Sequence, residues 1–302
     1  MFQKYKYHFL LHLIIFIWGF TGILGKLITL DFVLIVWYRV FIAAAFLACF
    51  FYFTKKSFKV DKKHWWKIGL VGLIVASHWL TFYYAIQLST ASLGILCLST
   101  TTLHVTWLEP IVMKRKFSWL EFALGTVVIY GIYFVSGNFS AKEMNALYIG
   151  LTSALCAAMF SVFNGRLVHD VPSTHLSFYE LSTGFIAISV FLLMTGRLNF
   201  GVFSMTYSDM GWLLFLGILC TSFAFLVTMD IVKRLGAFTV SLSINLEPVY
   251  TILLAIFILK EHKLLNSNFY IGSAIIILVV VLNGILKHFQ NKKLKINITE
   301  HE

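Results

Sequence analysis

Apolar runs of about 20 residues recur along the whole chain, and short polar connections separate them. A helix of that length crosses the roughly 30 Å of hydrocarbon in a bilayer. The runs predict ten spans, at about 8–28, 32–53, 66–86, 91–112, 118–136, 146–167, 175–195, 209–230, 237–259 and 268–288. The first run has no small-residue cleavage site after it, so we expect it to stay in the protein. The pattern predicts an all-α membrane protein with ten transmembrane helices.

Basic residues gather in alternate connections, and this distribution predicts the orientation of the helices. With the N-terminus in the cytoplasm, 18 of the 24 Lys and Arg residues fall in cytoplasmic segments and five fall in outside loops. Arg39 alone lies within a span. Because cytoplasmic loops carry an excess of Lys and Arg, we expect both termini on the cytoplasmic side of the inner membrane. The net charge of +11 then needs no nucleic-acid partner.

Composition narrows the class further. The chain is 59% hydrophobic and only 12% charged, which excludes an ordinary soluble domain. Its four cysteines all fall in predicted spans, where single thiols pack as small apolar groups. The sequence has no pair of His, Cys, Asp or Glu at a spacing typical of a metal site, and no cofactor motif. We therefore expect neither a metal nor a cofactor.

An internal repeat divides the chain into two halves of five spans. Residues 117–125 align with 264–272, and residues 37–39 align with 178–180. Because five is odd, the second copy enters the membrane from the opposite face, as in the inverted repeats of secondary transporters. We expect a first repeat at 1–140, a second at 141–290 and a polar cytoplasmic tail at 291–302. Such repeats place the substrate site near the midplane between them.

Several of these segments resemble the EamA-type branch of the drug/metabolite transporter superfamily. The first span reads Ile-Trp-Gly-Phe at 17–20, the second carries Arg39, and the ninth reads Leu-Glu-Pro at 246–248, followed by Lys-Glu at 260–261. The likeness covers about residues 8–288. It implies two inverted EamA repeats, alternating access, and transport of amino acids, nucleobases, vitamins or other metabolites. It does not identify the substrate.

The ninth span contains the residues that are most costly in a membrane, Asn245, Glu247 and Pro248. A charge near the bilayer centre costs about 2.5–3.5 kcal/mol, and a proline inside a helix removes a backbone donor. Both are tolerated where a cavity or a neighbouring helix satisfies the polar groups. An offset of 147 residues projects Glu247 onto Thr100 and Pro248 onto Thr101. We therefore predict an asymmetric site, with a carboxylate from one half and hydroxyls from the other.

Polar and aromatic side chains on other spans either line the same cavity or simply pack. Those on the third span form a face that suits a small ligand with an apolar body and a polar head. A packed aromatic stripe is the alternative, because 17% of all residues are aromatic. The candidates for the cavity are Trp18, His78, Trp79, Tyr83, Thr100, Thr101, His104, Asn245 and Glu247.

Arg39 and Glu180 occupy matching places in the two repeats. Charges within a membrane usually pair with one another, so we expect an inward-facing contact between them. That contact could act as a gate or could be a static ion pair. Glu180 could also simply cap the inner end of its helix.

The function predicted is secondary transport, with export of a small metabolite such as an amino acid across the cytoplasmic membrane. Glu247 offers a titratable group for coupling to protons. An integral-membrane enzyme is an alternative, but the sequence has no nucleophile elbow, no His-Glu-x-x-His and no phosphate-binding loop, so we expect no enzyme. A passive channel or scaffold is the other alternative. The expected partners are a small-molecule substrate and the lipid bilayer, with the chain a monomer or a homodimer.

Overall fold

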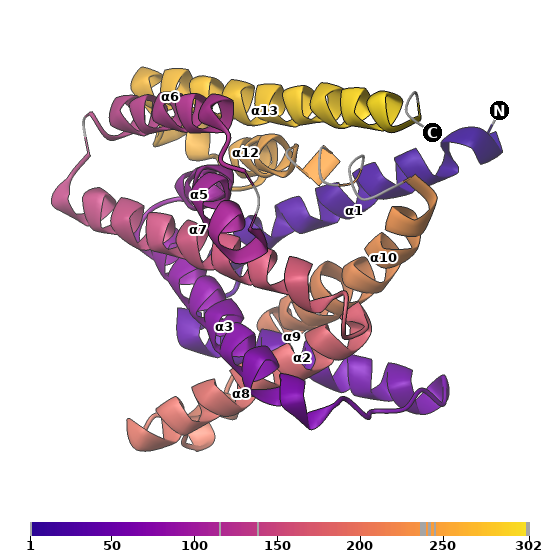
Figure 1. Cartoon of the computed structure of the whole chain (residues 1–302). Coiled ribbons are helices and arrows are strands. Elements are labelled where there is room, and N and C mark those ends of the chain that lie inside the picture. Colours follow the sequence, from indigo (N-terminus) through magenta and orange to yellow (C-terminus); the bar gives the residue numbers. More distant parts are fainter. Residues whose placement is uncertain are drawn as a thin grey trace.

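The computed structural model is a bundle of helices (Figure 1), and it describes residues 2–114, 116–137, 139–235, 240, 243–244 and 246–299. No strand occurs among these residues. The elements are α1 (Phe2–Leu27), α2 (Phe32–Phe53), η1 (Lys62–His64), α3 (Trp65–Leu88), α4 (Ala91–Ser99), α5 (Thr101–Met113), α6 (Trp119–Ser136), α7 (Ala141–Leu167), α8 (Ser173–Met194), η2 (Phe200–Phe203), α9 (Tyr207–Leu214), η3 (Phe215–Phe223), α10 (Ala224–Leu235), α12 (Glu247–Ile258), η4 (Glu261–Lys263) and α13 (Ser267–Thr299).

The ten-helix membrane fold is confirmed. Nine helical segments of the described chain are long and apolar enough to cross a membrane, and the shorter α12 lies in the ninth predicted span. The predicted tail at 291–302 differs from expectation, because α13 continues to Thr299. Nothing in the tail stops the helix, since residues 291–299 contain neither Gly nor Pro.

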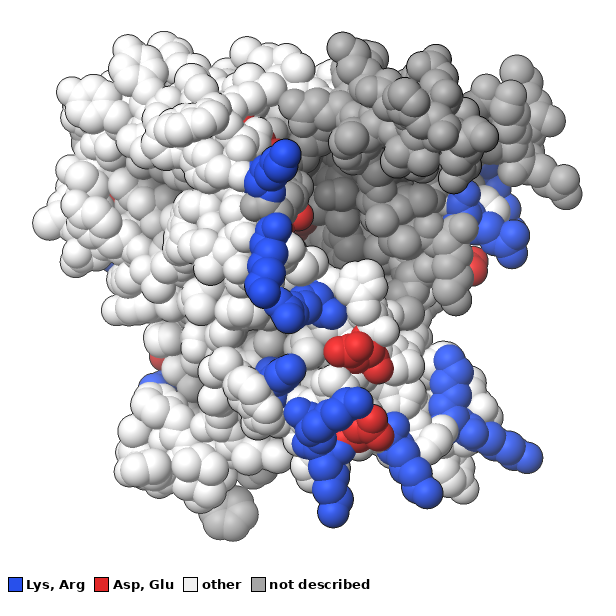
Figure 2. Space-filling model, viewed as in Figure 1, with Lys and Arg blue, Asp and Glu red and all other residues white. Residues whose placement is uncertain are grey.

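Both termini lie on the same side of the bundle (Figure 1). The basic connection between α2 and α3 is exposed, with Lys55, Lys56, Lys59, Lys62 and Lys63 all reaching solvent. Figure 2 shows few Lys or Arg side chains on the left of this face, which is the side away from the termini in Figure 1. The structure therefore shows the uneven distribution of Lys and Arg between the two ends of the bundle that the sequence predicts. That the basic end faces the cytoplasm stays a prediction.

The helix pairs follow the relation expected of two repeated halves. Helices α2 and α8 are both 22 residues long, and each begins and ends 141 residues from its counterpart. They pack against each other, and so do α6 and α13, the fifth helix of each half. The contact of α3 with α7 is matched by the contact of α10 with α1. Arg39 and Glu180 thus occupy equivalent places on equivalent helices.

The fourth span is not one regular helix, as the sequence suggested, but breaks between α4 and α5. Thr100 donates its hydroxyl to the Cys97 carbonyl at 2.6 Å, and Thr101 donates to Leu98 at 2.6 Å. Thr102 repeats the pattern with Ser99 at 3.2 Å. Side chains that bond to carbonyls three residues back compete with the regular backbone ladder and bend helices. The run of hydroxyl residues therefore produces the break.

Helix α3 crosses α8 at a very close approach. A Cβ on Gly72 would lie 2.7 Å from the Glu180 carbonyl oxygen, and a Cβ on Gly184 would lie 3.3 Å from Ala76. Small residues let membrane helices approach this closely, and van der Waals packing then holds them together. The crossing buries the backbone around Glu180.

Replacing Gly72 with alanine should destabilise the protein, because the new methyl group meets the backbone of α8. We expect Gly72→Ala to cost about 1–3 kcal/mol, measured by thermal unfolding of the purified protein in detergent. Gly69→Ala, one turn away on the same helix, is the control, because a methyl group added there would meet no neighbouring atom within 4 Å. Equal unfolding temperatures for the two variants would contradict the tight crossing.

Candidate functional site

A cavity of about 710 Å³ lies between the two halves of the bundle. Helices α1, α2, α3, α4 and α5 contribute from the first half, and α7, α8, η3, α10, α12 and α13 contribute from the second. Its size is that of a site for a small organic molecule. The polar side chains that line it are Thr21, Arg39, His78, Ser99, Thr101, Thr102, Ser161, Asn164, Ser177, Glu180, Thr221, Ser222, Glu247 and Asn283.

The cavity extends toward the end of the bundle that holds the termini. On α7 it is lined by Phe160, Ser161 and Asn164, near the end of that helix on the termini side. Ser177 and Glu180 lie near the start of α8, at the same end of the bundle. Toward the opposite end, Tyr83 is fully buried and closes the space behind the cavity.

Arg39 is buried at the cavity wall and is held from several directions. Its Nε donates to Thr221 Oγ1 at 3.0 Å, and its Nη1 donates to Tyr83 Oη at 3.2 Å. The guanidinium carbon lies 4.1 Å from the centre of the Trp79 ring, a cation–π contact. Tyr83 Oη in turn donates to the Thr21 carbonyl at 3.2 Å. All of these partners are neutral, so they orient the charge without cancelling it.

Arg39 therefore presents unused hydrogen-bond capacity at the cavity. A guanidinium has five N–H donors, and two of them have acceptors among the described residues. Within that part of the chain no carboxylate lies within 4.0 Å of it. A planar cation with free donors is suited to a carboxylate or phosphate group, which it can bind through two parallel bonds.

The expected ion pair between Arg39 and Glu180 is not formed in this conformation. Arg39 donates to the neutral oxygens of Thr221 and Tyr83, and Glu180 accepts instead from Asn164 Nδ2 at 3.1 Å. Both residues line the cavity, and their pairing in another conformation and a gating role both stay proposals. Glu180 does not cap a helix end either, because it lies seven residues inside α8.

Glu247 and Pro248 form the first turn of α12. At that position a proline removes no intrahelical bond, and a carboxylate interacts favourably with the helix dipole. The proline therefore costs little there, whereas the buried carboxylate still needs polar surroundings. Glu247 lines the cavity, whereas Asn245 lies outside the described residues.

The structure corrects the register between the two broken spans by one residue. From Thr101 to Glu247, where α5 and α12 begin, the separation is 146 residues. From Lys114 to Lys260, the left-handed residues that follow these helices, it is again 146. Thr101, and not Thr100, is therefore the counterpart of Glu247.

The remaining candidates divide into two groups. Trp18, His78, Trp79 and Thr101 line the cavity. Three others do not: Tyr83 lies behind Arg39, Thr100 is fully buried against its own helix, and His104 packs edge-on against Trp107. Each of the three satisfies or packs its polar group locally, which spacing along a helix does not reveal.

Comparison with known proteins adds to this geometry. The sequence profile of the EamA-like transporter family matches residues 6–137 and again residues 144–285. The chain belongs to the EamA-like transporter family. The two matched segments correspond to five predicted spans each.

Relatives of this EamA-like transporter share its length and carry only general names. An uncharacterized transporter of Archaeoglobus fulgidus is 24% identical over 94% of this chain and 99% of its own. The uncharacterized transporter YoaV of Bacillus subtilis is 22% identical over 88% of this chain and 92% of its own. A solved crystal structure superposes with a TM-score of 0.65 at 15% identity, over 92% of this chain and 97% of that one, and shows the shared fold.

Sequence reasoning missed several residues that line the cavity of this transporter, among them Asn164, Thr221 and Asn283. Thr221 lies in the π-helical stretch η3, where its hydroxyl donates to the Leu216 carbonyl five residues back at 2.8 Å. π-Helical turns are rare and often occur at functional sites. No residue pattern in the eighth span signals this geometry.

Two buried carboxylates join the halves at the end opposite the termini, and we call them the clamps. Asp209 accepts from the Thr29 backbone N–H and hydroxyl, both at 2.8 Å. Glu261 accepts from the backbone N–H groups of Ala91 and Ser92 at 2.8 and 3.0 Å, and from the Ser92 hydroxyl at 2.6 Å. The second clamp caps the start of α4, where a negative charge is favoured. Together they hold this end of the bundle closed.

The corrected register can be tested by chemical labelling. In a variant whose four native cysteines are replaced, Thr101→Cys should react with a water-soluble thiol reagent, because residue 101 lines the cavity. Thr100→Cys should react far more slowly, because residue 100 is fully buried. Mass spectrometry of both variants measures the two rates. If Thr100→Cys reacts faster than Thr101→Cys, residue 100 and not residue 101 faces the cavity, and the corrected register is wrong.

Proposed function

We propose that this EamA-like transporter exports a small zwitterionic metabolite, such as an amino acid, across the cytoplasmic membrane by alternating access. The observation that carries the proposal is the Arg39 guanidinium, which faces the cavity with no carboxylate partner among the described residues. A buried charge that no carboxylate contacts within 4.0 Å is costly. A substrate carboxylate that binds there would supply the missing partner.

Glu247 gives the other half of the recognition. It lines the same cavity and comes from the opposite repeat, with Thr101 as its neutral counterpart. A carboxylate there is a suitable partner for the ammonium group of a zwitterion. Apolar residues of the lining, among them Trp18, Phe82 and Phe160, offer surface for the rest of the substrate. The asymmetry of the two repeats thus matches a substrate with one positive and one negative end.

The two ends of the bundle differ in a way that supports alternating access. The cavity extends toward the termini, while the clamps close the opposite end. Both clamps use a carboxylate of the second half and hydrogen-bond donors of the first, so they can separate only if the halves move. We further propose that the termini are cytoplasmic, which makes this conformation open to the inside.

Flux into proteoliposomes tests the proposal with a panel of amino acids, nucleobases and other metabolites, with and without a pH gradient. Arg39→Gln should lower the flux of the best substrate about tenfold or more, because it removes a charge-assisted interaction of about 1.5–3 kcal/mol. The flux of Arg39→Lys should lie between that of the wild type and that of Arg39→Gln, because lysine keeps the charge but not the planar pair of donors.

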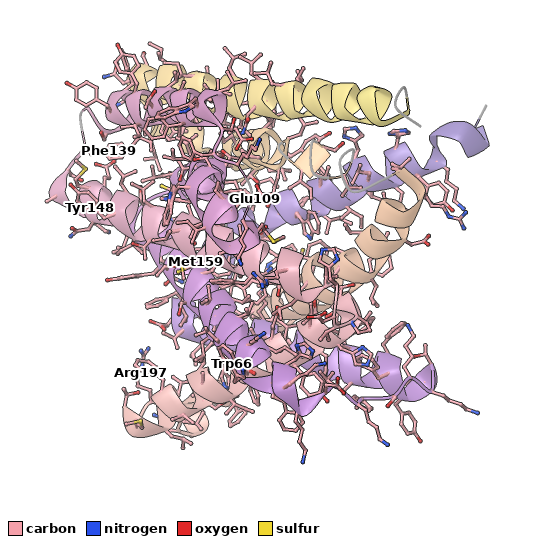
Figure 3. All side chains as sticks on the ribbon, in the orientation of Figure 1. Trp66, Glu109, Phe139, Tyr148, Met159 and Arg197 are labelled. Carbon is pink, nitrogen blue, oxygen red and sulfur yellow. The ribbon has the colours of Figure 1, made fainter. Side chains whose placement is uncertain are left out.

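Arg197→Gln is the matched control. Arg197 lies at the end of the bundle away from the termini (Figure 3), and it pairs with Asp31 at 3.0 Å in a half-exposed contact. Such exposed pairs contribute little, so we expect wild-type flux. Equal flux for Arg39→Gln and wild type would remove the carboxylate subsite. Absence of flux for the whole panel would contradict the transporter proposal.

A further inference from the structure

Two buried oxygen atoms at the cavity wall have no hydrogen-bond partner. They are Glu180 Oε1 and Asn164 Oδ1, and both residues line the cavity. The other ends of the same two groups are bonded, since Asn164 Nδ2 donates to Glu180 Oε2 at 3.1 Å. Both unpartnered atoms are acceptors when Glu180 is a carboxylate. Leaving buried acceptors unsatisfied costs about 1–3 kcal/mol each, so the arrangement lacks one donor.

A single proton satisfies both atoms. When it binds to Glu180 Oε1, a new O–H bond forms and the group becomes a neutral carboxylic acid. That O–H can donate to Asn164 Oδ1, while Asn164 Nδ2 still donates to Oε2. The acid and the carboxamide then share two parallel hydrogen bonds in one closed ring, and neither has an unused buried polar atom. We propose that Glu180 and Asn164 form a proton-binding pair.

The surroundings of Glu180 favour the neutral acid over the anion. The residue is only 5% exposed, and the tight crossing with Gly72 of α3 covers its backbone. The charged and titratable groups that share the cavity with Glu180 are Arg39 on α2, His78 on α3, Cys220 on η3 and Glu247 on α12. Within the part of the chain that the structure describes, Arg39 makes no ion pair with Glu180. A buried carboxylate without a cation is costly and is relieved by binding a proton.

His78 does not supply the missing donor. Its Nδ1 lies 3.0 Å from the Ser153 carbonyl oxygen, and the Ser153 hydroxyl donates to the His78 carbonyl at 2.9 Å. These reciprocal contacts tie α3 to α7 and use Nδ1, and Glu180 Oε1 and Asn164 Oδ1 receive no bond from either ring nitrogen. We infer that the proton is exchanged with solvent through the cavity.

The pair would give the carrier a place to couple protons to its substrate, an extension that rests on the proposed function. In this proposal the two carboxylates of the cavity have different roles. Glu180 holds a proton through Asn164, whereas Glu247 faces the cationic group of the substrate. Loss of the proton from Glu180 leaves two orphaned acceptors, which a change of conformation or a cationic group can then relieve. Proton binding thereby becomes linked to the state of the cavity.

Infrared difference spectroscopy of the full-length protein in lipid tests the pair without any substrate. At neutral pH the wild type should show the carbonyl stretch of a protonated carboxylic acid that shifts in heavy water. Glu180→Gln should remove that component. This variant should still fold, because a glutamine can donate to Asn164 and accept from it in the same ring. Circular dichroism checks the folding of each variant.

Three further variants make the spectral test specific. Asn164→Leu should shift the component to higher frequency, because the bond to the acid carbonyl is lost. Asn283→Leu removes another amide of the cavity and should leave the component in place. Glu247→Gln should also retain it. The proposal is overturned if Glu180→Gln leaves the spectrum unchanged, or if Asn164→Leu leaves the component at its wild-type frequency.

Proteoliposome flux then tests the coupling role. With a substrate found in the panel, a pH gradient should change the wild-type flux severalfold and should leave that of Glu180→Gln unchanged. A gradient effect that persists in the variant, or an equal loss of flux with and without the gradient, overturns coupling through Glu180. If the wild type moves no solute, the transporter proposal fails, and the spectrum still decides whether the proton-binding pair exists.

Discussion

A guanidinium held at the cavity wall by neutral partners is the constraint on which the rest of the site depends. Arg39 lies within a membrane-spanning bundle, yet its bonds go to the hydroxyls of Thr221 and Tyr83 and its face lies on Trp79. A static ion pair would have neutralised this charge and removed the reason for a ligand to bind. The π-helical stretch brings Thr221 to the guanidinium, and the buried Tyr83 fixes its other side. The fold therefore keeps one charge oriented, with no carboxylate partner among the described residues.

The two repeats share a scaffold but differ in chemistry at equivalent places. Arg39 corresponds to Glu180 on helices of equal length, and Thr101 corresponds to Glu247 at the starts of α5 and α12. A cavity between such halves carries different groups on its two sides. That difference suits a substrate with unlike ends, whereas two identical halves would recognise a symmetric one. The same logic applies to the clamps, in which carboxylates of the second half meet donors of the first.

Much of the fold could be predicted because membrane helices are long and apolar, and charged residues gather in the connections between them. The spans, the orientation and the inward position of Arg39, Glu180 and Glu247 all follow from the cost of polar groups in lipid. The break at Thr100 and the π-helix around Thr221 could not be predicted, because competition between side-chain and backbone hydrogen bonds depends on neighbouring helices. The Arg39–Glu180 pair is absent from this conformation for a related reason: Arg39 bonds to neutral hydroxyls and Glu180 accepts from the Asn164 amide, and spacing along the chain does not reveal these partners. Asn164 has no sequence signal beyond being an ordinary amide.

Alternating access predicts opposite movements at the two ends of the bundle, and distances between pairs of spin labels, measured by electron paramagnetic resonance, report both. One pair of labels, at Tyr133 of the first half and Tyr207 of the second, spans the clamped end, and another, at Phe53 of the first half and Ile285 of the second, spans the end with the termini. All four side chains are exposed, so labels there should not disturb packing. When substrate and a gradient are supplied, the first distance should lengthen while the second shortens. If both distances stay fixed, or both lengthen together as in an opening channel, the two halves do not alternate and the account is wrong.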